Sequence, residues 1–236
     1  QNNGVFQTLD GATLPGTPAM IVGSNHHIAW GFTNSYGDWS DVIKLNVSSD
    51  QSQYKTVNGY KEFEVSQEII QIKGQESVSI DVTTTQWGPV IGKDHNQTLL
   101  AYRWVAHDFE GVNFNLLDLE QATTTEQAVK TSHGMGVPAL NIIVGDKQGN
   151  IAWTIAGAIP NKFGFEPTNN HGWNVPQDWS TGLLGWNGYK SSNEYPVLNS
   201  PKHPRLWTGN SRVVGGDSLN TIGHGGYALG ARSQQI

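Results

Sequence analysis

Residues 28–41 read IAWGFTNSYGDWSD, and this stretch decides how the rest of the chain is understood. Its apolar start, IAW, predicts a buried strand, because a short apolar run is typical of strands with both faces covered. Asn34, Asp38 and Asp41 follow almost at once, without a turn signal long enough for a loose loop. Polar side chains placed directly behind a buried strand are candidates for a functional site.

The composition indicates a globular, β-rich chain. The 236 residues are 36% hydrophobic and 14% charged, with 28 glycines and 9 tryptophans, which fits one large domain or a piece of a bigger protein. The net charge of −6, with no basic stripe, argues against a nucleic-acid partner. No apolar run approaches the roughly 20 residues of a membrane helix. The absence of cysteine excludes disulfides, zinc–thiolate sites and thiol catalysis.

Strand patterns dominate the order of elements. Strands separated by turns are expected over 5–48, and a β-meander over about 46–106. Helices are expected near 114–121 and 124–133, the second opened by the capping-box spacing of Thr123 and Glu126 and stopped by Gly134. Residues 139–160 predict a hairpin of two apolar strands. Residues 161–207, rich in Gly, Asn, Pro and Trp, are expected to form long ordered loops.

Common catalytic motifs are absent from the sequence. There is no HExxH motif and no G-x-S-x-G motif, so a zinc protease or a Ser–His–Asp hydrolase is not expected. The eight histidines are interpreted as surface or capping residues.

Two pairs of polar residues remain as candidates. Asp38 and Asp41 repel each other unless a cation or a cationic side chain lies between them. This turn is interpreted as either a calcium loop or a turn with two solvated carboxylates. Asn34 and Asn141 each stand at an edge of an apolar strand. A buried asparagine amide either bonds to neighbouring backbone, which spacing alone favours, or serves as a donor for a ligand oxygen.

Several stretches, in order, resemble the penicillin acylase (penicillin amidase) family of N-terminal nucleophile hydrolases. The resemblance spans nearly the whole chain, and LPGTPxxxxGxNxxIAWGFTN is its most specific part. The stretches are GATLPGTPAMIVGSNHHIAWGFTNSYGDWSDV (11–42), QEIIQIKGQESVSIDVTTTQWGPVIG (67–92), YRWVAHD (102–108), PALNIIVGDKQGNIAWTIAGAIP (138–160), GNSRVVGG (209–216) and GYALGARSQQI (226–236).

The resemblance implies a fold and a reaction. The fold is a β-rich α+β part of an αββα sandwich, with a β-meander insertion and long ordered loops. Residues 1–236 would be an internal segment of the family's large chain, truncated at both ends. The reaction is hydrolysis of linear amides, such as the side chains of penicillin, cephalosporin or acyl-homoserine lactones. The family's nucleophile is a serine exposed by precursor cleavage, whose own α-amino group, with a pKa near ~8, is the base.

Because Gln1 has no nucleophilic side chain, that serine is expected upstream and the segment alone is expected to be inactive. The expected partners are the small-molecule amide, the smaller α chain and the rest of the large chain, in a periplasmic or secreted protein.

The resemblance also assigns residues. Two donors to the developing oxyanion match the backbone N–H of Asn34 and the side-chain amide of Asn141. A cation that steadies the site, usually arginine in the family, falls on Lys162. A structural calcium ion would take the carboxylates of Asp38 and Asp41 and the carbonyl of Ser40, with further ligands on the α chain.

The acyl pocket of relatives matches Val22, Phe32 and Tyr36. Phe32 stands where phenylacetyl-selective members have a small residue. We therefore do not expect benzylpenicillin specificity, and aliphatic acyl chains remain open.

Two alternatives remain. Nine tryptophans and a calcium-like turn would also suit a non-catalytic carbohydrate-binding β-sandwich, although such a module has no reason to carry the ordered acylase stretches. A degenerate acylase retained as a structural protein is the other.

Overall fold

The computed structural model describes residues 7–165, 175–200 and 205–236, and the chain divides into two compact units. Unit 1 comprises 1–39, 108–160 and 188–236, and unit 2 comprises 40–107 and 161–187. The expected β-meander region lies in unit 2. Each unit is described by itself.

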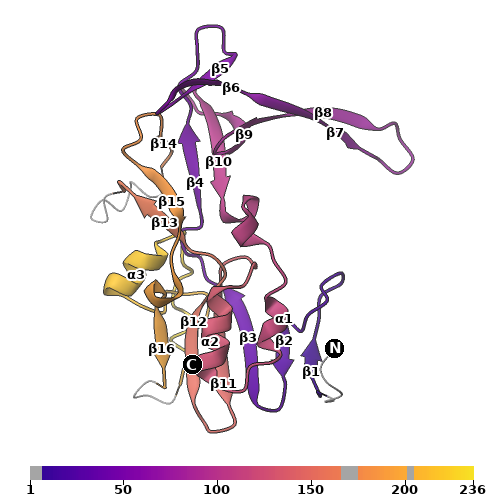
Figure 1. The fold of residues 1–236 in the computed structure, drawn as a ribbon, viewed down its shortest axis with the longest axis vertical. Helices are drawn as coiled ribbons and strands as arrows, with labels where there is room; N and C mark the ends of the chain where they lie inside the picture. Colours follow the sequence, from indigo (N-terminus) through magenta and orange to yellow (C-terminus); the bar gives the residue numbers. More distant parts are fainter. Residues whose placement is uncertain (1–6, 166–174, 201–204) are drawn as a thin grey trace. The chain divides into compact units, whose positions relative to one another are not determined.

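Unit 1 contains a six-stranded sheet in the order β1-β2-β3-β11-β12-β16, in which all neighbours are antiparallel (Figure 1). The apolar run that begins at Ile28 forms β3, which pairs with β11 along its whole length. The strands are β1 (Asp10–Ala12), β2 (Val22–Ser24), β3 (Ile28–Asn34), β11 (Leu140–Asp146), β12 (Ile151–Ala156) and β16 (Val197–Asn199).

The central strands of unit 1 are covered on both faces. Trp30 and Ile142 belong to a core cluster with helix residues such as Leu119 and Ala128. Trp153 and Ile155 belong to a second cluster, which includes Ile222. Successive side chains of a strand point to opposite faces, so β3, β11 and β12 read as apolar runs rather than as alternating patterns.

The helices of unit 1 are short. They are α1 (Leu116–Leu119), α2 (Thr125–His133) and α3 (Gly216–Ile222), with 3₁₀ turns η2 (Phe109–Gly111) and η3 (Ser192–Glu194). Helix α2 packs on β11 and β12 (Figure 1). Its N-cap is Thr124, whose side chain accepts a hydrogen bond from the backbone N–H of Gln127. The cap is therefore one residue later than the spacing of Thr123 and Glu126 indicated.

Unit 2 contains a second six-stranded sheet in the order β14-β4-β10-β9-β8-β7. Its neighbours are antiparallel except for β14 and β4. The strands are β4 (Ser40–Lys44), β7 (Glu64–Ile70), β8 (Val78–Thr85), β9 (Gly88–Lys93), β10 (Leu99–Trp104) and β14 (Gln177–Asp178). A hairpin of β5 (Gln53–Thr56) and β6 (Gly59–Glu62), the 3₁₀ turn η1 (Val105–His107), and the pair β13 (Pro160–Phe163) and β15 (Gly185–Tyr189) complete the described elements.

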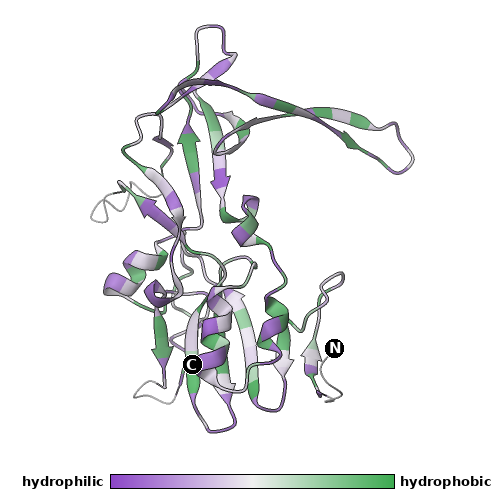
Figure 2. Cartoon of the chain, in the orientation of Figure 1, coloured by the Kyte–Doolittle hydropathy of each residue, from purple (hydrophilic) through white to green (hydrophobic). Residues whose placement is uncertain are grey.

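Strands β7 and β8 form a long ribbon that extends from the sheet of unit 2 (Figure 1). Every residue of β7 is exposed, and apolar positions such as Val65 and Ile69 are 63% and 66% exposed. Apolar segments are visible along this ribbon in Figure 2. The hydrophobic core of unit 2 is instead a cluster of buried side chains that includes Ile43, Ala101 and Trp179.

The structure confirms the expected hairpin of apolar strands as β11 and β12, and it corrects the expectation for 161–207. Within that range the described residues include β13, β14, β15 and β16, whereas 166–174 and 201–204 lie outside the described residues. Helix α3 was not predicted, because its N-cap, Gly215, makes no side-chain cap. Among the described residues, no helix is long and apolar enough to cross a membrane.

Candidate functional site

The turn behind β3 is fixed by hydrogen bonds and by close packing. The Ser35 hydroxyl donates to the carbonyl of Ala139 over 2.5 Å and accepts from the Trp39 indole over 3.1 Å. Tyr36 has a φ of +51°, a left-handed conformation that few non-glycine residues adopt. A Cβ atom at Gly37 would lie 2.0 Å from the Trp39 ring. This turn is therefore a built structure rather than a loose loop.

Asn141 lies buried beside the end of β3. Its amide nitrogen donates to the carbonyl of Asn34 over 3.1 Å and to the hydroxyl of Thr33 over 3.2 Å. Its amide oxygen accepts from the Trp153 indole over 2.9 Å. Only 2% of Asn141 is exposed, so these bonds offset the cost of burying an amide.

The two asparagines that the resemblance singles out therefore lie on neighbouring strands. Leu140 pairs with Asn34, and Asn141 pairs with Thr33. In the described structure the Asn141 amide contacts the carbonyl of Asn34, and both of its hydrogens have protein acceptors. Donation to a ligand oxygen requires one of these hydrogens to leave its acceptor.

Residues from the C-terminal part of unit 1 support the same strand end. The side-chain amide of Asn210 also donates to the carbonyl of Asn34, over 3.0 Å, and Arg232 donates to Asn210 over 2.7 Å. The hydroxyls of Thr33 and Thr208 lie 2.7 Å apart. The stretches around 209–216 and 226–236 thus contribute to the surroundings of Asn34 and Asn141.

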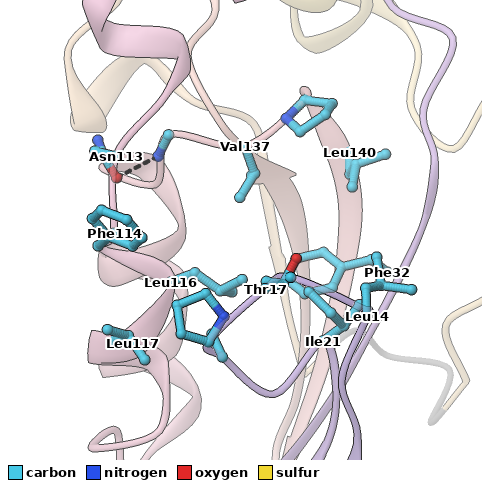
Figure 3. A pocket seen from close by; sticks show the side chains of 15 residues that line it. Leu14, Thr17, Ile21, Phe32, Asn113, Phe114, Leu116, Leu117, Val137 and Leu140 are labelled. Atoms are coloured by element: carbon cyan, nitrogen blue, oxygen red, sulfur yellow. Dashed lines mark hydrogen bonds between the residues drawn. The ribbon is translucent and has the colours of Figure 1, made fainter.

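An apolar cavity of about 390 Å³ opens in unit 1 next to these strands (Figure 3). Phe32 on β3 and Leu140 on β11 form one wall, and Leu116 and Leu117 on α1 form another. Figure 3 shows the side chains of Leu14, Ile21 and Phe32 gathered at one end of the space. The remaining lining residues are Gly16, Thr17, Pro18, Ala19, Asn113, Phe114, Gly136, Val137 and Pro138.

Of the three residues expected in an acyl pocket, Phe32 lines this cavity, whereas Val22 and Tyr36 are not among its lining residues. Val22, on β2, is 48% exposed, and Tyr36 is 37% exposed. Sequence reasoning did not identify the walls formed by α1 and by 136–138, because no local pattern relates these segments to β3. It also missed the Trp153 indole that orients the amide of Asn141.

Lys162 lies in unit 2 and pairs with Asp41. Its ammonium nitrogen is 2.8 Å from Oδ2 of Asp41, and the Trp186 indole donates to the same oxygen over 2.5 Å. Burial raises the pKa of Asp41 above its ordinary value, while Lys162 and Trp186 act in the opposite direction by favouring the ionised form. The cation expected at the acyl-transfer site is thus found with a carboxylate expected to bind calcium.

The other residues of the expected calcium loop are Asp38, in unit 1, and Ser40, the first residue of β4 in unit 2. The backbone N–H of Asp38 donates to the carbonyl of Ile222 over 2.8 Å. Burial raises the pKa of Tyr227 to about 12. The charge of Arg212 lowers this pKa, and the carboxylate of Asp38 raises it by disfavouring ionisation of the Tyr227 hydroxyl. Within the described ranges, no group of three or more His, Cys, Asp or Glu side chains that could hold a metal ion is found.

His133, at the end of α2, is partly buried rather than on the surface. Its Nε2 lies 2.9 Å from the hydroxyl of Thr154, which donates to the carbonyl of Pro196, so Nε2 carries the proton and donates to Thr154. Its Nδ1, 2.7 Å from the hydroxyl of Ser192, then accepts. Burial lowers the pKa of His133 to about 4. Such a weak base is unsuited to activating Ser192 at neutral pH.

Comparison with known protein families decides the family. Residues 7–236 match the family model described as penicillin amidase. The chain belongs to the penicillin amidase family. It is 28% identical over 220 residues to acyl-homoserine lactone acylase QuiP of Pseudomonas aeruginosa, covering 86% of this chain and 25% of that protein. It is 26% identical over 210 residues to the penicillin acylase 2 proenzyme of Pseudomonas sp. strain SE83, covering 88% and 26% respectively.

A solved structure agrees with the fold. The thermostable penicillin G acylase of Alcaligenes faecalis superposes with a TM-score of 0.79 at 21% identity, covering 98% of this chain and 42% of that chain. The expected β-rich α+β part of an N-terminal nucleophile hydrolase fold is thereby confirmed. The chain spans about a quarter of the length of the two acylases named above.

Proposed function

We propose that this chain is the part of an amide hydrolase that holds an apolar acyl group and stabilises the oxyanion formed at its carbonyl. The observation that carries the proposal is the apolar cavity of about 390 Å³ whose wall residues Phe32 and Leu140 lie next to Asn34 and Asn141 on the same strands. An acyl chain in this cavity would place its carbonyl near the end of β3.

The oxyanion would take one donor from the backbone N–H of Asn34 and one from the amide of Asn141. Hydrogen-bond donors fixed before the reaction stabilise developing charge without having to reorganise, and each such donor is worth roughly 3 kcal/mol. Asn141 is fixed by Trp153 on its oxygen side. Its longer bond, the 3.2 Å contact with Thr33, is the one we expect to exchange for the substrate oxygen.

The nucleophile is proposed from the family resemblance. It is a serine that becomes N-terminal on processing, with its α-amino group as base, and it is not assigned to any of the 236 residues. One relative carries the word proenzyme in its name, which agrees with processing in that protein. The 236 residues alone are therefore proposed to have no turnover.

The lining of the cavity favours an unbranched aliphatic acyl group over phenylacetyl. Phe32 takes up part of the wall, and the other lining residues include four Leu, one Ile and one Val, with few polar groups. Each buried methylene contributes about 0.8 kcal/mol, so kcat/KM should rise about fourfold per added carbon until the cavity is full. Two of the relatives named above are an acyl-homoserine lactone acylase and a penicillin acylase, which agrees with an amide substrate carrying an acyl side chain.

The test is a series of chromogenic amides with acyl chains of increasing length, together with a phenylacetyl amide, assayed with the complete processed protein. We expect kcat/KM to rise with chain length and the phenylacetyl amide to be a poor substrate. Phe32→Ala should shift the preferred acyl group to a larger one, whereas Val22→Ala, outside the cavity lining, should leave the preference unchanged. If kcat/KM does not depend on acyl length in the wild type or in Phe32→Ala, this assignment of the pocket is refuted.

A further inference from the structure

Asp41 on β4 is paired with a cation of the chain itself. The ammonium of Lys162 and the indole of Trp186 both contact Oδ2 of Asp41, at 2.8 and 2.5 Å. The side chains of Lys162 and Asp41 are only 15% and 6% exposed. Water therefore screens this ion pair weakly. Removing Lys162 would leave a buried carboxylate without the cation that compensates its charge.

A second cation lies beside the same carboxylate. Arg103 on β10 is directly opposite Asp41 in the β4–β10 pairing, which places their Cβ atoms about 4.5–5.5 Å apart. The guanidinium carbon of Arg103 is 4.8 Å from the centre of the Trp186 ring, and the Lys162 nitrogen is 5.5 Å from it. Two positive side chains thus share one aromatic ring next to one carboxylate.

These surroundings do not fit a calcium ligand. Calcium takes about six to eight oxygen ligands and is held by an excess of negative charge. At Asp41 the neighbouring side chains supply two positive charges, and one carboxylate oxygen already pairs with an ammonium at 2.8 Å and accepts a hydrogen bond from an indole. A divalent ion at this carboxylate would have to displace Lys162 from Oδ2, or bind through Oδ1 and be repelled by both Lys162 and Arg103.

We infer that the ammonium of Lys162 pairs with Asp41 in place of the calcium ion that the family resemblance implies there. Because it is attached to the chain, we call it a tethered cation. In this chain the junction of β4, β10 and β13 is then stable without a divalent ion. The aliphatic stem of Lys162 is long enough to bring the ammonium under Trp186, and the ammonium also lies 5.7 Å from the centre of the Phe165 ring. This role is structural and does not depend on the proposed amide hydrolysis.

The first experiment measures calcium directly. The purified protein is dialysed against excess chelator, and its thermal midpoint is compared in chelator and in millimolar CaCl₂. We expect the same midpoint in both, and the same bound calcium, measured by atomic emission, in wild type and Asp41→Asn. Calcium that the wild type retains and Asp41→Asn loses, together with a lower wild-type midpoint in chelator, would overturn the inference.

The second experiment removes the tethered charge. Lys162→Met should lower the thermal midpoint by about 5 °C or more, because it removes the only cation with a described ion pair to this buried carboxylate. Lys162→Arg should recover most of that loss, and Lys93→Met, at an exposed position of unit 2, should change little. A Lys162→Met protein as stable as Lys93→Met would contradict the tethered cation. If Lys162→Met does not fold, the calcium measurements on wild type and Asp41→Asn still decide.

Discussion

At the scale of single residues, Asn141 makes structural bonds that are compatible with the oxyanion role proposed for it. The Trp153 indole holds the amide oxygen, and Thr33 and Asn34 hold the amide hydrogens, so the side chain has one orientation. A donor whose position is already fixed loses little entropy when a charged oxygen appears. For the proposed role, the contact with Trp153 keeps the amide in this orientation, while the hydrogen on Thr33 exchanges to the oxyanion.

Gly37 belongs to the same scale, because it leaves room for the Trp39 ring behind β3. A methyl group at this position would lie 2.0 Å from that ring. We expect Gly37→Ala to lower the free energy of unfolding by about 1–3 kcal/mol, the usual cost of overpacking. The measurement is urea unfolding followed by tryptophan fluorescence. Gly230→Ala, where nothing lies within 4 Å of the added carbon, is the control. Equal losses of unfolding free energy in the two variants would show that the Trp39 ring moves aside at no cost, and would contradict the prediction.

His133 predicts a pH dependence of stability. Burial lowers its pKa to about 4, below the ordinary 6.5, so the unfolded chain takes up a proton first as the pH falls. Its contribution is therefore fully present above pH 6.5 and is lost progressively between about 6.5 and 4, on the order of 2 kcal/mol once its partial exposure is allowed for. His133→Gln should flatten this part of the stability curve, measured by urea unfolding at several pH values. His95→Gln, at an exposed position, should not. An unchanged slope in His133→Gln would contradict the assignment.

At the scale of elements, the β7–β8 ribbon is the exposed feature of unit 2. Strand β7 is the last strand of its sheet, all its residues are exposed, and Ile69 is 66% exposed. Unpaired edges with apolar side chains favour association with other chains. We expect Ile69→Lys to reduce self-association of the 236-residue chain in sedimentation velocity runs at increasing concentration. Gln67→Lys adds the same charge on the same face and should have a smaller effect. Equal effects would assign the association to charge alone.

Elements with local signals were predictable from sequence, and contacts between distant segments were not. The apolar runs of β3, β11 and β12 and the polar start of α2 are visible in short windows. Helix α3 has only Gly215 as its N-cap and therefore lacks a side-chain signal. The pairing of Lys162 with Asp41 joins residues far apart in sequence, and nothing near either residue indicates it. From the sequence alone, Asp41 is therefore assigned to calcium and Lys162 to the acyl-transfer site, with no indication that the two side chains are in contact.

At the scale of the whole molecule, the two units contain different candidate features. Unit 1 contains the apolar cavity, the β3–β11 pair and the network around Asn141. Unit 2 contains the buried Asp41 with its cations and the exposed ribbon. The family assignment covers both units, since the matched residues run from 7 to 236. The chain nevertheless spans only about a quarter of its named relatives, so the complete protein is the object in which activity is measured.

The central claim is that Asn141 donates to the oxyanion, and the most direct test compares two variants of the complete processed protein. Asn141→Ala removes the donor, and Trp153→Phe removes the structural bond to the same amide but leaves its hydrogens. On one acyl amide, kcat should fall about 10²–10³-fold in Asn141→Ala and only a few-fold in Trp153→Phe, with KM little changed in either. Equal losses of kcat in the two variants, or an Asn141→Ala protein with wild-type kcat, would contradict the account.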